Sequence, residues 1–204
     1  MYRKHYYSNK AEFLKLNLAL LAVSLCAQMA ADPKKKKRRL KGKKEIEREL
    51  KEYKTFPLDF CQIDLKNDNE MIWIVTIQGP KDSCYNGIFE LELGFSKRYP
   101  IEVPLHKMLT HTFHININEQ GKICCGILDN EWKKESTVRD ILLSVYDLLK
   151  KPDPTAAIND EALNLFVDNE KEYYKTAAQW TEKYASANKN SQQDLNQDDQ
   201  KAGD

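Results

Sequence analysis

Hydrophobic and polar residues alternate in the central part of the chain. The alternation is strict over 87–95, where four apolar side chains face one way and two glutamates the other: Phe89, Leu91, Leu93 and Phe95 against Glu90 and Glu92. That period predicts a half-buried strand. Two apolar runs precede it, at 58–65 and 71–77, with turn-forming sequences between them. We therefore expect an antiparallel meander. A fourth strand is expected near 106–110, and Pro104 indicates that its start lies at an edge.

Helical periodicity flanks these strands. Residues 45–54 place Ile46, Leu50 and Tyr53 on one face, and Pro57 ends the pattern. After Thr137 a single apolar stripe consists of Val138, Ile141, Leu142, Val145, Leu148 and Leu149. Further helices are expected from about Asp160 and along a pattern of Tyr173, Ala177, Trp180 and Tyr184. Helix, strands, irregular segment and helices in this order predict an α+β fold, with the sheet packed on a central helix.

The irregular segment 101–123 is too long for an incidental connection, and loops of that length are usually functional. Its second half overlaps HININEQGKICCGIL, residues 114–128. This stretch combines a histidine, two asparagines and two adjacent cysteines. A cysteine nucleophile, a metal site and a pair of buried cysteines are the three interpretations. A metal site built from His111, His114, Cys124 and Cys125 is the weakest of them. Adjacent cysteines chelate a tetrahedral ion awkwardly, and there is no Cys-x-x-Cys.

The composition shows an asymmetric distribution of charge and indicates the redox environment of the protein. The 204 residues suffice for one well-buried domain with extensions. The net charge is +1 overall, but residues 1–44 carry 13 Lys/Arg and two acids, whereas the rest carries 19 basic and 29 acidic side chains. A basic arm on an acidic body suggests that the arm contacts something the body does not. Five cysteines without framework spacing fit a reducing compartment.

The basic arm contains an apolar run at 16–31, after four basic residues. It resembles a secretory signal or an organelle presequence, is short for a bilayer span, and would also suit an amphipathic docking helix. Pro33–Lys44 is a lysine-rich block, expected to be a disordered linker. Nuclear import, acidic lipids and nucleic acid are its functional interpretations, although without aromatics base stacking has no support. The polar tail, 186–204, is expected to be disordered.

Residues 45–185 resemble the core of the E2 ubiquitin-conjugating enzyme family. The matching landmarks, in family order, are the helix at 45–54, Tyr99-Pro100, His114-x-Asn116, Gly121-x-Ile123-Cys124, Ile127-Leu128, Trp132 and Pro152-x-Pro154. The eight-residue step from Asn116 to Cys124 is the most specific element. The resemblance implies the family's fold: an N-terminal helix, a four-stranded antiparallel meander, an irregular active-site segment, a central helix and C-terminal helices.

For function, the resemblance implies two-stage acyl transfer without a cofactor or metal. Cys124 would accept the carboxyl end of ubiquitin, or of a ubiquitin-like protein, from an activating enzyme as a thioester, and pass it to a lysine or to a ligase. Cysteine suits this role because it is nucleophilic without a strong base. Asn116 would donate to the oxyanion, and His114 would hold the loop. The residues that would bind partners are Ile101, Trp132, Lys133 and Lys134.

The chain also departs from the family pattern. Ile115 replaces the proline of the usual His-Pro-Asn, which frees φ and restores an N–H, so the loop is expected to be less preorganised. Ala156 stands where the family often has an acidic residue that orients or deprotonates the incoming lysine. Lys133-Lys134-Glu135 replaces the usual sequence after the tryptophan. The alternative function is therefore a catalytically degenerate, structural subunit of a larger complex, which could contact an organelle or a membrane through residues 1–44.

The compartment follows from the same two interpretations. An active conjugating enzyme is expected in the cytoplasm or nucleus, and the N-terminal segment leaves an organelle such as the mitochondrion as the alternative. Nuclear import, membrane contact and organelle import all predict that deleting residues 1–44 changes the distribution of the protein. No specific nucleic-acid partner is expected.

Overall fold

The computed structural model describes residues 33–186, and the side chains from residue 42 onward. The apolar run at 16–31 and the polar tail from 187 lie outside these residues, so the expectations placed on them stay predictions. Within 33–186, no helix is both long and apolar enough to cross a membrane.

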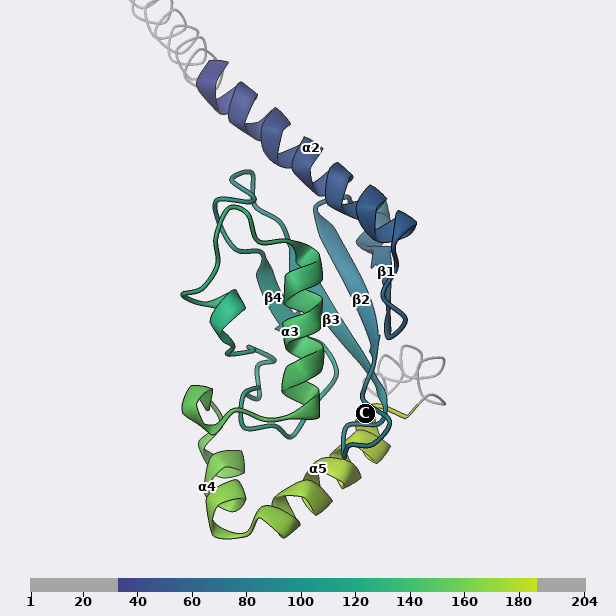
Figure 1. The fold of residues 1–204 in the computed structure, drawn as a ribbon, viewed down its shortest axis with the longest axis vertical. Helices are drawn as coiled ribbons and strands as arrows, with labels where there is room; N and C mark the ends of the chain where they lie inside the picture. The colour runs from purple at the N-terminus through teal and green to yellow at the C-terminus, as the bar shows by residue number, and fades with distance from the viewer. Residues whose placement is uncertain (1–32, 187–204) are drawn as a thin grey trace, which may run out of the picture. The chain divides into compact units, whose positions relative to one another are not determined.

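Four antiparallel strands form one sheet in the order β1-β2-β3-β4, as the meander predicts (Figure 1). The strands are β1 (Cys61–Leu65), β2 (Ile72–Gln78), β3 (Ile88–Gly94) and β4 (Leu105–Met108). Register pairs Val75 with Leu91, and Leu91 with Met108. Every second residue of β2 and β3 is buried, so one face of the sheet forms the core. Strand β4 is an edge strand and begins directly after Pro104, as expected.

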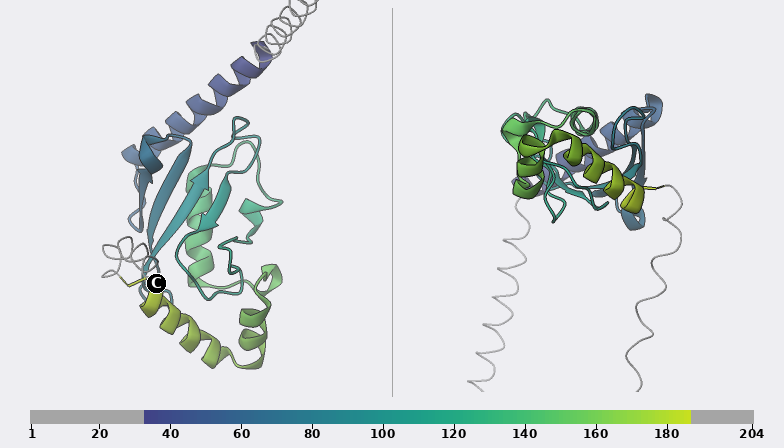
Figure 2. Two further views of the ribbon diagram at one scale, coloured as in Figure 1. Left: turned by 180° about the vertical axis from the view of Figure 1, so that it is seen from behind. Right: turned by 90° about the horizontal axis from the view of Figure 1, so that it is seen from below.

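Helix α3 (Val138–Lys150) lies across the buried face of this sheet (Figure 1). Its six buried residues are those of the apolar stripe: Val138, Ile141, Leu142, Val145, Leu148 and Leu149. Thr137 begins the helix through a capping box with Asp140. Helices α4 (Asp160–Asp168) and α5 (Glu170–Tyr184) follow at the end of the sheet where β3 begins (Figures 1 and 2). The Ile88 N–H of β3 donates to the Ala185 carbonyl at 2.7 Å, which joins the end of α5 to the sheet.

Helix α2 (Pro33–Thr55) begins earlier than the residue 45 expected, so the stretch expected to be a disordered linker is helical. Proline is well tolerated in a first helical turn, and lysine and arginine are good helix formers. From α2 the buried carboxylate of Glu49 accepts hydrogen bonds from the Val138 N–H, at 2.6 Å, and from the Tyr99 hydroxyl. Burial raises the pKa of Glu49. This side chain therefore joins α2 to the start of α3 and to the Tyr99-Pro100 turn.

Candidate active site

The loop that carries Cys124 is held by a tight turn. Gly121 has φ of +80°, and a Cβ there would overlap the Met108 carbonyl oxygen, so glycine is required. The Asn118 side-chain oxygen accepts from the Gln120 N–H at 3.1 Å and from the Lys122 N–H at 2.9 Å. A bridge between Ile117 and Ile123 closes the turn. The backbone leading to Cys124 is thus fixed from both sides.

His114 is fully buried and has both ring nitrogens engaged. Nε2 lies 3.1 Å from the Leu148 carbonyl oxygen of α3, and Nδ1 accepts from the Asn116 N–H at 2.9 Å. An acceptor at Nδ1 places the proton on Nε2, which donates to Leu148. Burial lowers the pKa of His114 to about 4. A neutral imidazole with no free nitrogen serves neither as a base at neutral pH nor as a metal ligand; it joins the loop to α3.

The buried imidazole makes stability depend on pH. The folded-state pKa of about 4 lies below the unfolded value of about 6.5, so its contribution is complete above pH 6.5 and is lost as the pH falls towards 4. We expect the difference in unfolding free energy between wild type and His114→Gln to narrow by about 3 kcal/mol from pH 7 to pH 4. Urea denaturation of both proteins checks this. A difference that stays constant with pH would contradict a neutral, buried His114.

Asn116 connects the cysteine loop to the segment after α3. Its side-chain amide is buried and pairs with the Asp153 backbone: Nδ2 donates to the carbonyl at 2.6 Å, and Oδ1 accepts from the N–H at 2.9 Å. Its own backbone carbonyl accepts from the Cys124 N–H at 2.9 Å. An amide nitrogen carries two hydrogens, so one remains beyond the bond to Asp153. Asn116 is therefore fixed beside the cysteine with its carboxamide bound to the short helix η3 (Pro154–Ala156).

Cys124 is half-buried on an exposed loop, and its Sγ donates to the Asp129 carboxylate at 3.2 Å. Partial burial is the main cause of a raised pKa at Cys124, followed by the hydrogen bond to Asp129 and that residue's charge, whereas the charge of Lys122 acts the other way. The group is thus mainly a thiol at neutral pH. Cys125 is buried, which raises its pKa to about 11.

Asp129 was missed by the sequence reasoning. It lies five positions after Cys124, and only the turn of helix η2 (Gly126–Leu128) brings the two side chains together. Asp153, by contrast, is occupied locally, since its carboxylate accepts from the Thr155 N–H at 2.9 Å and from the Thr155 hydroxyl at 2.7 Å. Those hydrogen bonds lower the pKa of Asp153.

Ile115 is fully buried. Its carbonyl accepts from the Ile158 N–H at 2.8 Å and the Asn159 N–H at 3.1 Å, and its N–H lies 3.4 Å from the Tyr173 hydroxyl of α5. The expectation of a less preorganised loop took only the missing proline ring into account. Packing and these backbone contacts hold the position in its place.

The residues expected to bind partners lie in two adjoining loops. Ile101 is 67% exposed, and Lys133 and Lys134 are exposed as well. Trp132 is half-buried, and its indole N–H donates to the Pro100 carbonyl at 2.8 Å. That bond joins the tryptophan loop to the loop of Ile101, so Trp132 both packs and brings the exposed side chains of the two loops together.

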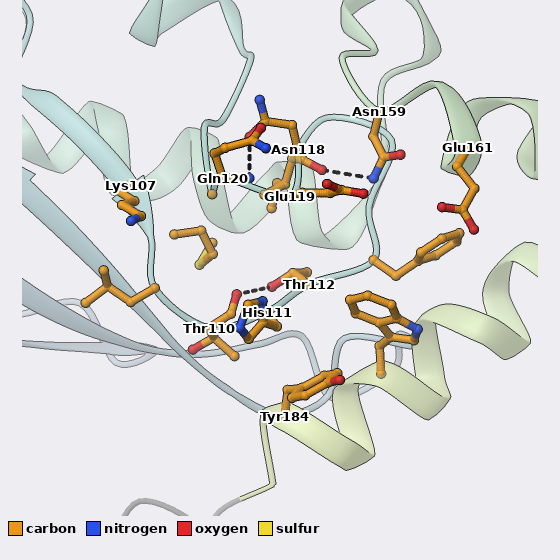
Figure 3. Close-up of a pocket in the computed structure, with 16 residues that line it drawn as sticks. Lys107, Thr110, His111, Thr112, Asn118, Glu119, Gln120, Asn159, Glu161 and Tyr184 are labelled. Atoms are coloured by element: carbon orange, nitrogen blue, oxygen red, sulfur yellow. Dashed lines mark hydrogen bonds between the residues drawn. The ribbon is translucent and has the colours of Figure 1, made fainter. Parts of the chain in front are cut away.

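A cavity of about 570 Å³ lies beside the turn at 118–121, which precedes Cys124 (Figure 3). The rings of His111 and Tyr184 stand 5.4 Å apart in its wall. Cys124, which is half-buried, does not line it. Among the described residues, no three His, Cys, Asp or Glu side chains are grouped as metal ligands would be.

Compared with known protein families, residues 45–181 match the family described as "Ubiquitin-conjugating enzyme". This range covers more than half of the chain and includes the sheet, helix α3, the Cys124 loop and the partner-facing loops. Its limits lie close to those of the resemblance drawn from the landmarks, 45–185.

Proposed function

The chain belongs to the ubiquitin-conjugating enzyme family, and on that premise we propose that it carries ubiquitin or a ubiquitin-like protein as a thioester on Cys124. The observation that supports this best is the position of the thiol, half-buried on an exposed loop whose backbone is fixed by Gly121 and Asn116. A reacting carbonyl at the end of a protein needs such open access. The nucleophile in turn needs a fixed approach direction.

Two acyl transfers make up the reaction. The Cys124 sulfur attacks the thioester formed by the activating enzyme, and the activating enzyme's thiol leaves. An amine of the target, or the cysteine of a ligase, then attacks the Cys124 thioester and releases the thiol. Each attack passes through a tetrahedral oxyanion. Asn116, whose backbone carbonyl accepts from the Cys124 N–H and whose carboxamide is bound to the Asp153 backbone, is the proposed donor to that oxyanion.

Partner recognition is proposed for the two joined loops. Ile101 supplies an exposed apolar side chain, and Lys133 and Lys134 supply positive charge beside it. An exposed apolar anchor with a charged rim is typical of a protein interface. An activating enzyme and a ligase are the partners that the family membership implies, and these loops are where we propose that the ligase binds.

A charging assay tests the function directly. We expect purified protein, incubated with activating enzyme, ATP and ubiquitin, to form an adduct that thiols cleave. In Cys124→Ser the adduct should become an ester that resists thiols and is cleaved by alkali, because oxygen replaces sulfur as the acyl carrier. The same reaction is run with each ubiquitin-like protein and its own activating enzyme. Gel mobility with and without reductant is the measurement.

Cys125→Ala is the matched control, because it removes the adjacent thiol and should leave charging intact. An adduct that survives in Cys124→Ala but not in Cys125→Ala would contradict the assignment of the nucleophile. Absence of any adduct with every modifier would contradict the enzyme function. It would favour the structural-subunit alternative, for which Ala156 and the replaced loop Lys133–Glu135 are the motivating observations.

A further inference from the structure

Asp129 is the charged side chain that contacts the proposed nucleophile. Its Oδ2 accepts from the Cys124 Sγ at 3.2 Å. The side chain is exposed, and it forms no salt bridge with any of the described side chains. An unpaired carboxylate in contact with a reacting sulfur is open both to solvent and to an approaching cation.

The backbone fixes where this carboxylate lies. Helix η2 begins directly after Cys125, and its turn closes through the Leu128 N–H to the Cys125 carbonyl, at 2.9 Å. The Asp129 N–H then donates to the Gly126 carbonyl at 3.1 Å. The Gly126 carbonyl also accepts from the Glu131 N–H at 2.9 Å, so the chain folds back at this point. The position of Asp129 beside Cys124 is therefore set by a turn rather than by a flexible side chain alone.

Transfer to lysine requires a proton acceptor. A lysine amine has an ordinary pKa of about 10.4 and is protonated at neutral pH, and its nitrogen attacks only after it gives up a proton. Ala156 supplies no carboxylate. The Asp153 carboxylate is already bound by the Thr155 N–H and hydroxyl. Asp129 remains as the carboxylate that is both in contact with the sulfur and unpaired.

We propose that Asp129 is the catalytic base and the docking anion for the acceptor amine, in place of the carboxylate that Ala156 lacks. The proposal rests on the proposed thioester function of Cys124. Asp129 then has two consecutive tasks. Before charging, its carboxylate accepts the hydrogen bond of the Cys124 thiol, and after charging, it is free to accept a hydrogen bond from the lysine ammonium.

Protons and bonds balance in both steps. In charging, the Cys124 sulfur bonds to the acyl carbon as its proton passes to Asp129, and the activating enzyme's sulfur leaves and takes that proton from Asp129, which returns the carboxylate to its ionised form. In transfer, the lysine ammonium gives one proton to Asp129 as its nitrogen bonds to the acyl carbon. The carbon–sulfur bond then breaks, and the departing Cys124 sulfur takes the proton back from Asp129 while the nitrogen loses its remaining excess proton to water. An amide and a free thiol result.

Discharge of the preformed thioester to two amines tests the proposal. The probe is Cys124 charged with ubiquitin, or with the ubiquitin-like protein that charges it, mixed with free lysine or with hydroxylamine, which is already neutral at pH 7. For Asp129→Asn we expect discharge to lysine to slow by about 10²-fold and discharge to hydroxylamine to change little. Asp129→Glu should restore part of the rate towards lysine. Asp82→Asn, at an exposed position in the β2–β3 connection, is the matched control and should behave as wild type.

An unchanged or faster discharge of Asp129→Asn to lysine would overturn the proposal, since the carboxylate would then be neutral or inhibitory. An equal loss towards both amines would also overturn it, because it would indicate a damaged loop rather than a missing base. Failure of the wild-type protein to charge would instead overturn the proposed function itself.

A second measurement does not depend on any modifier. Iodoacetamide alkylation of Cys124, followed by peptide mass spectrometry that resolves it from Cys125, reports how readily the thiol ionises. Removing the negative charge in Asp129→Asn lowers the pKa of Cys124, so we expect several-fold faster alkylation at pH 7 than in wild type and in Asp82→Asn. An identical pH profile in Asp129→Asn and wild type would show that the contact does not exist in solution and would overturn the proposal.

Discussion

Replacing Asn116 with alanine should slow discharge of the Cys124 thioester to lysine by about 10²- to 10³-fold, the range observed when one donor to an oxyanion is removed. The same change should lower the unfolding free energy by about 2 kcal/mol, because the Asp153 N–H and carbonyl lose the carboxamide that pairs with them. Single-turnover discharge and urea denaturation measure the two effects separately. Charging of Cys124 should be the less affected half-reaction, since a cysteine nucleophile reacts readily with a thioester.

Asn118→Ala provides the matched control for Asn116. Asn118 lies in the same loop, and its side chain also makes two hydrogen bonds to the backbone, accepting both, from the Gln120 and Lys122 N–H groups; neither bond involves Asp153. It should lose stability on the same scale and retain most of the discharge rate. If both variants slow discharge equally, then loosening of the loop explains the loss, and Asn116 is a positioning residue without a role at the oxyanion.

Ile115→Ala should lower the unfolding free energy by about 2–5 kcal/mol. Ile115 is fully buried between the cysteine loop and the segment after α3, so truncation removes apolar contacts and leaves a cavity. The same site holds the backbone of His114 and Asn116, so we also expect slower discharge of the thioester. Urea denaturation at pH 7 gives the first quantity.

Ile101→Ala is the control for Ile115→Ala, since it removes the same atoms from a side chain that is 67% exposed. Its effect on the unfolding free energy should stay within about 0.5 kcal/mol. A loss at position 115 as small as that at position 101 would mean that the loop is not packed as described, and that the missing proline leaves it loose after all.

Much of the fold could be predicted from periodicity because the pattern coincides with burial. In β3 the alternating Phe89, Leu91 and Leu93 are the buried residues, and the apolar stripe after Thr137 is the buried face of α3. The start of β1 was less predictable. Phe60 belongs to the apolar run at 58–65 but lies in a turn just before the strand, where its ring stacks on Tyr146 of α3 with centroids 4.1 Å apart and its carbonyl accepts from the Gln78 N–H of β2.

Only part of the candidate site could be predicted from the sequence. Cys124, Asn116 and His114 stand in a recognisable order, and the structure brings them together around one turn. The Asn116 contact with Asp153 spans 37 residues, and the Asp129 contact depends on a single turn of 3₁₀ helix. Neither leaves a periodic trace in the sequence. The early start of α2 was missed for another reason: a block of lysines indicates repulsion but has good helix propensity.

The Cys124–Asp129 contact has a consequence for how long the nucleophile survives between reactions. Oxidants such as peroxide react with the thiolate, so susceptibility follows the ionised fraction and exposure. Cys124 is accessible, but its raised pKa keeps that fraction small at neutral pH. Partial burial and the Asp129 carboxylate therefore both protect the thiol from sulfenic acid formation while no acyl group is bound, and the sulfur no longer needs this protection once it is acylated.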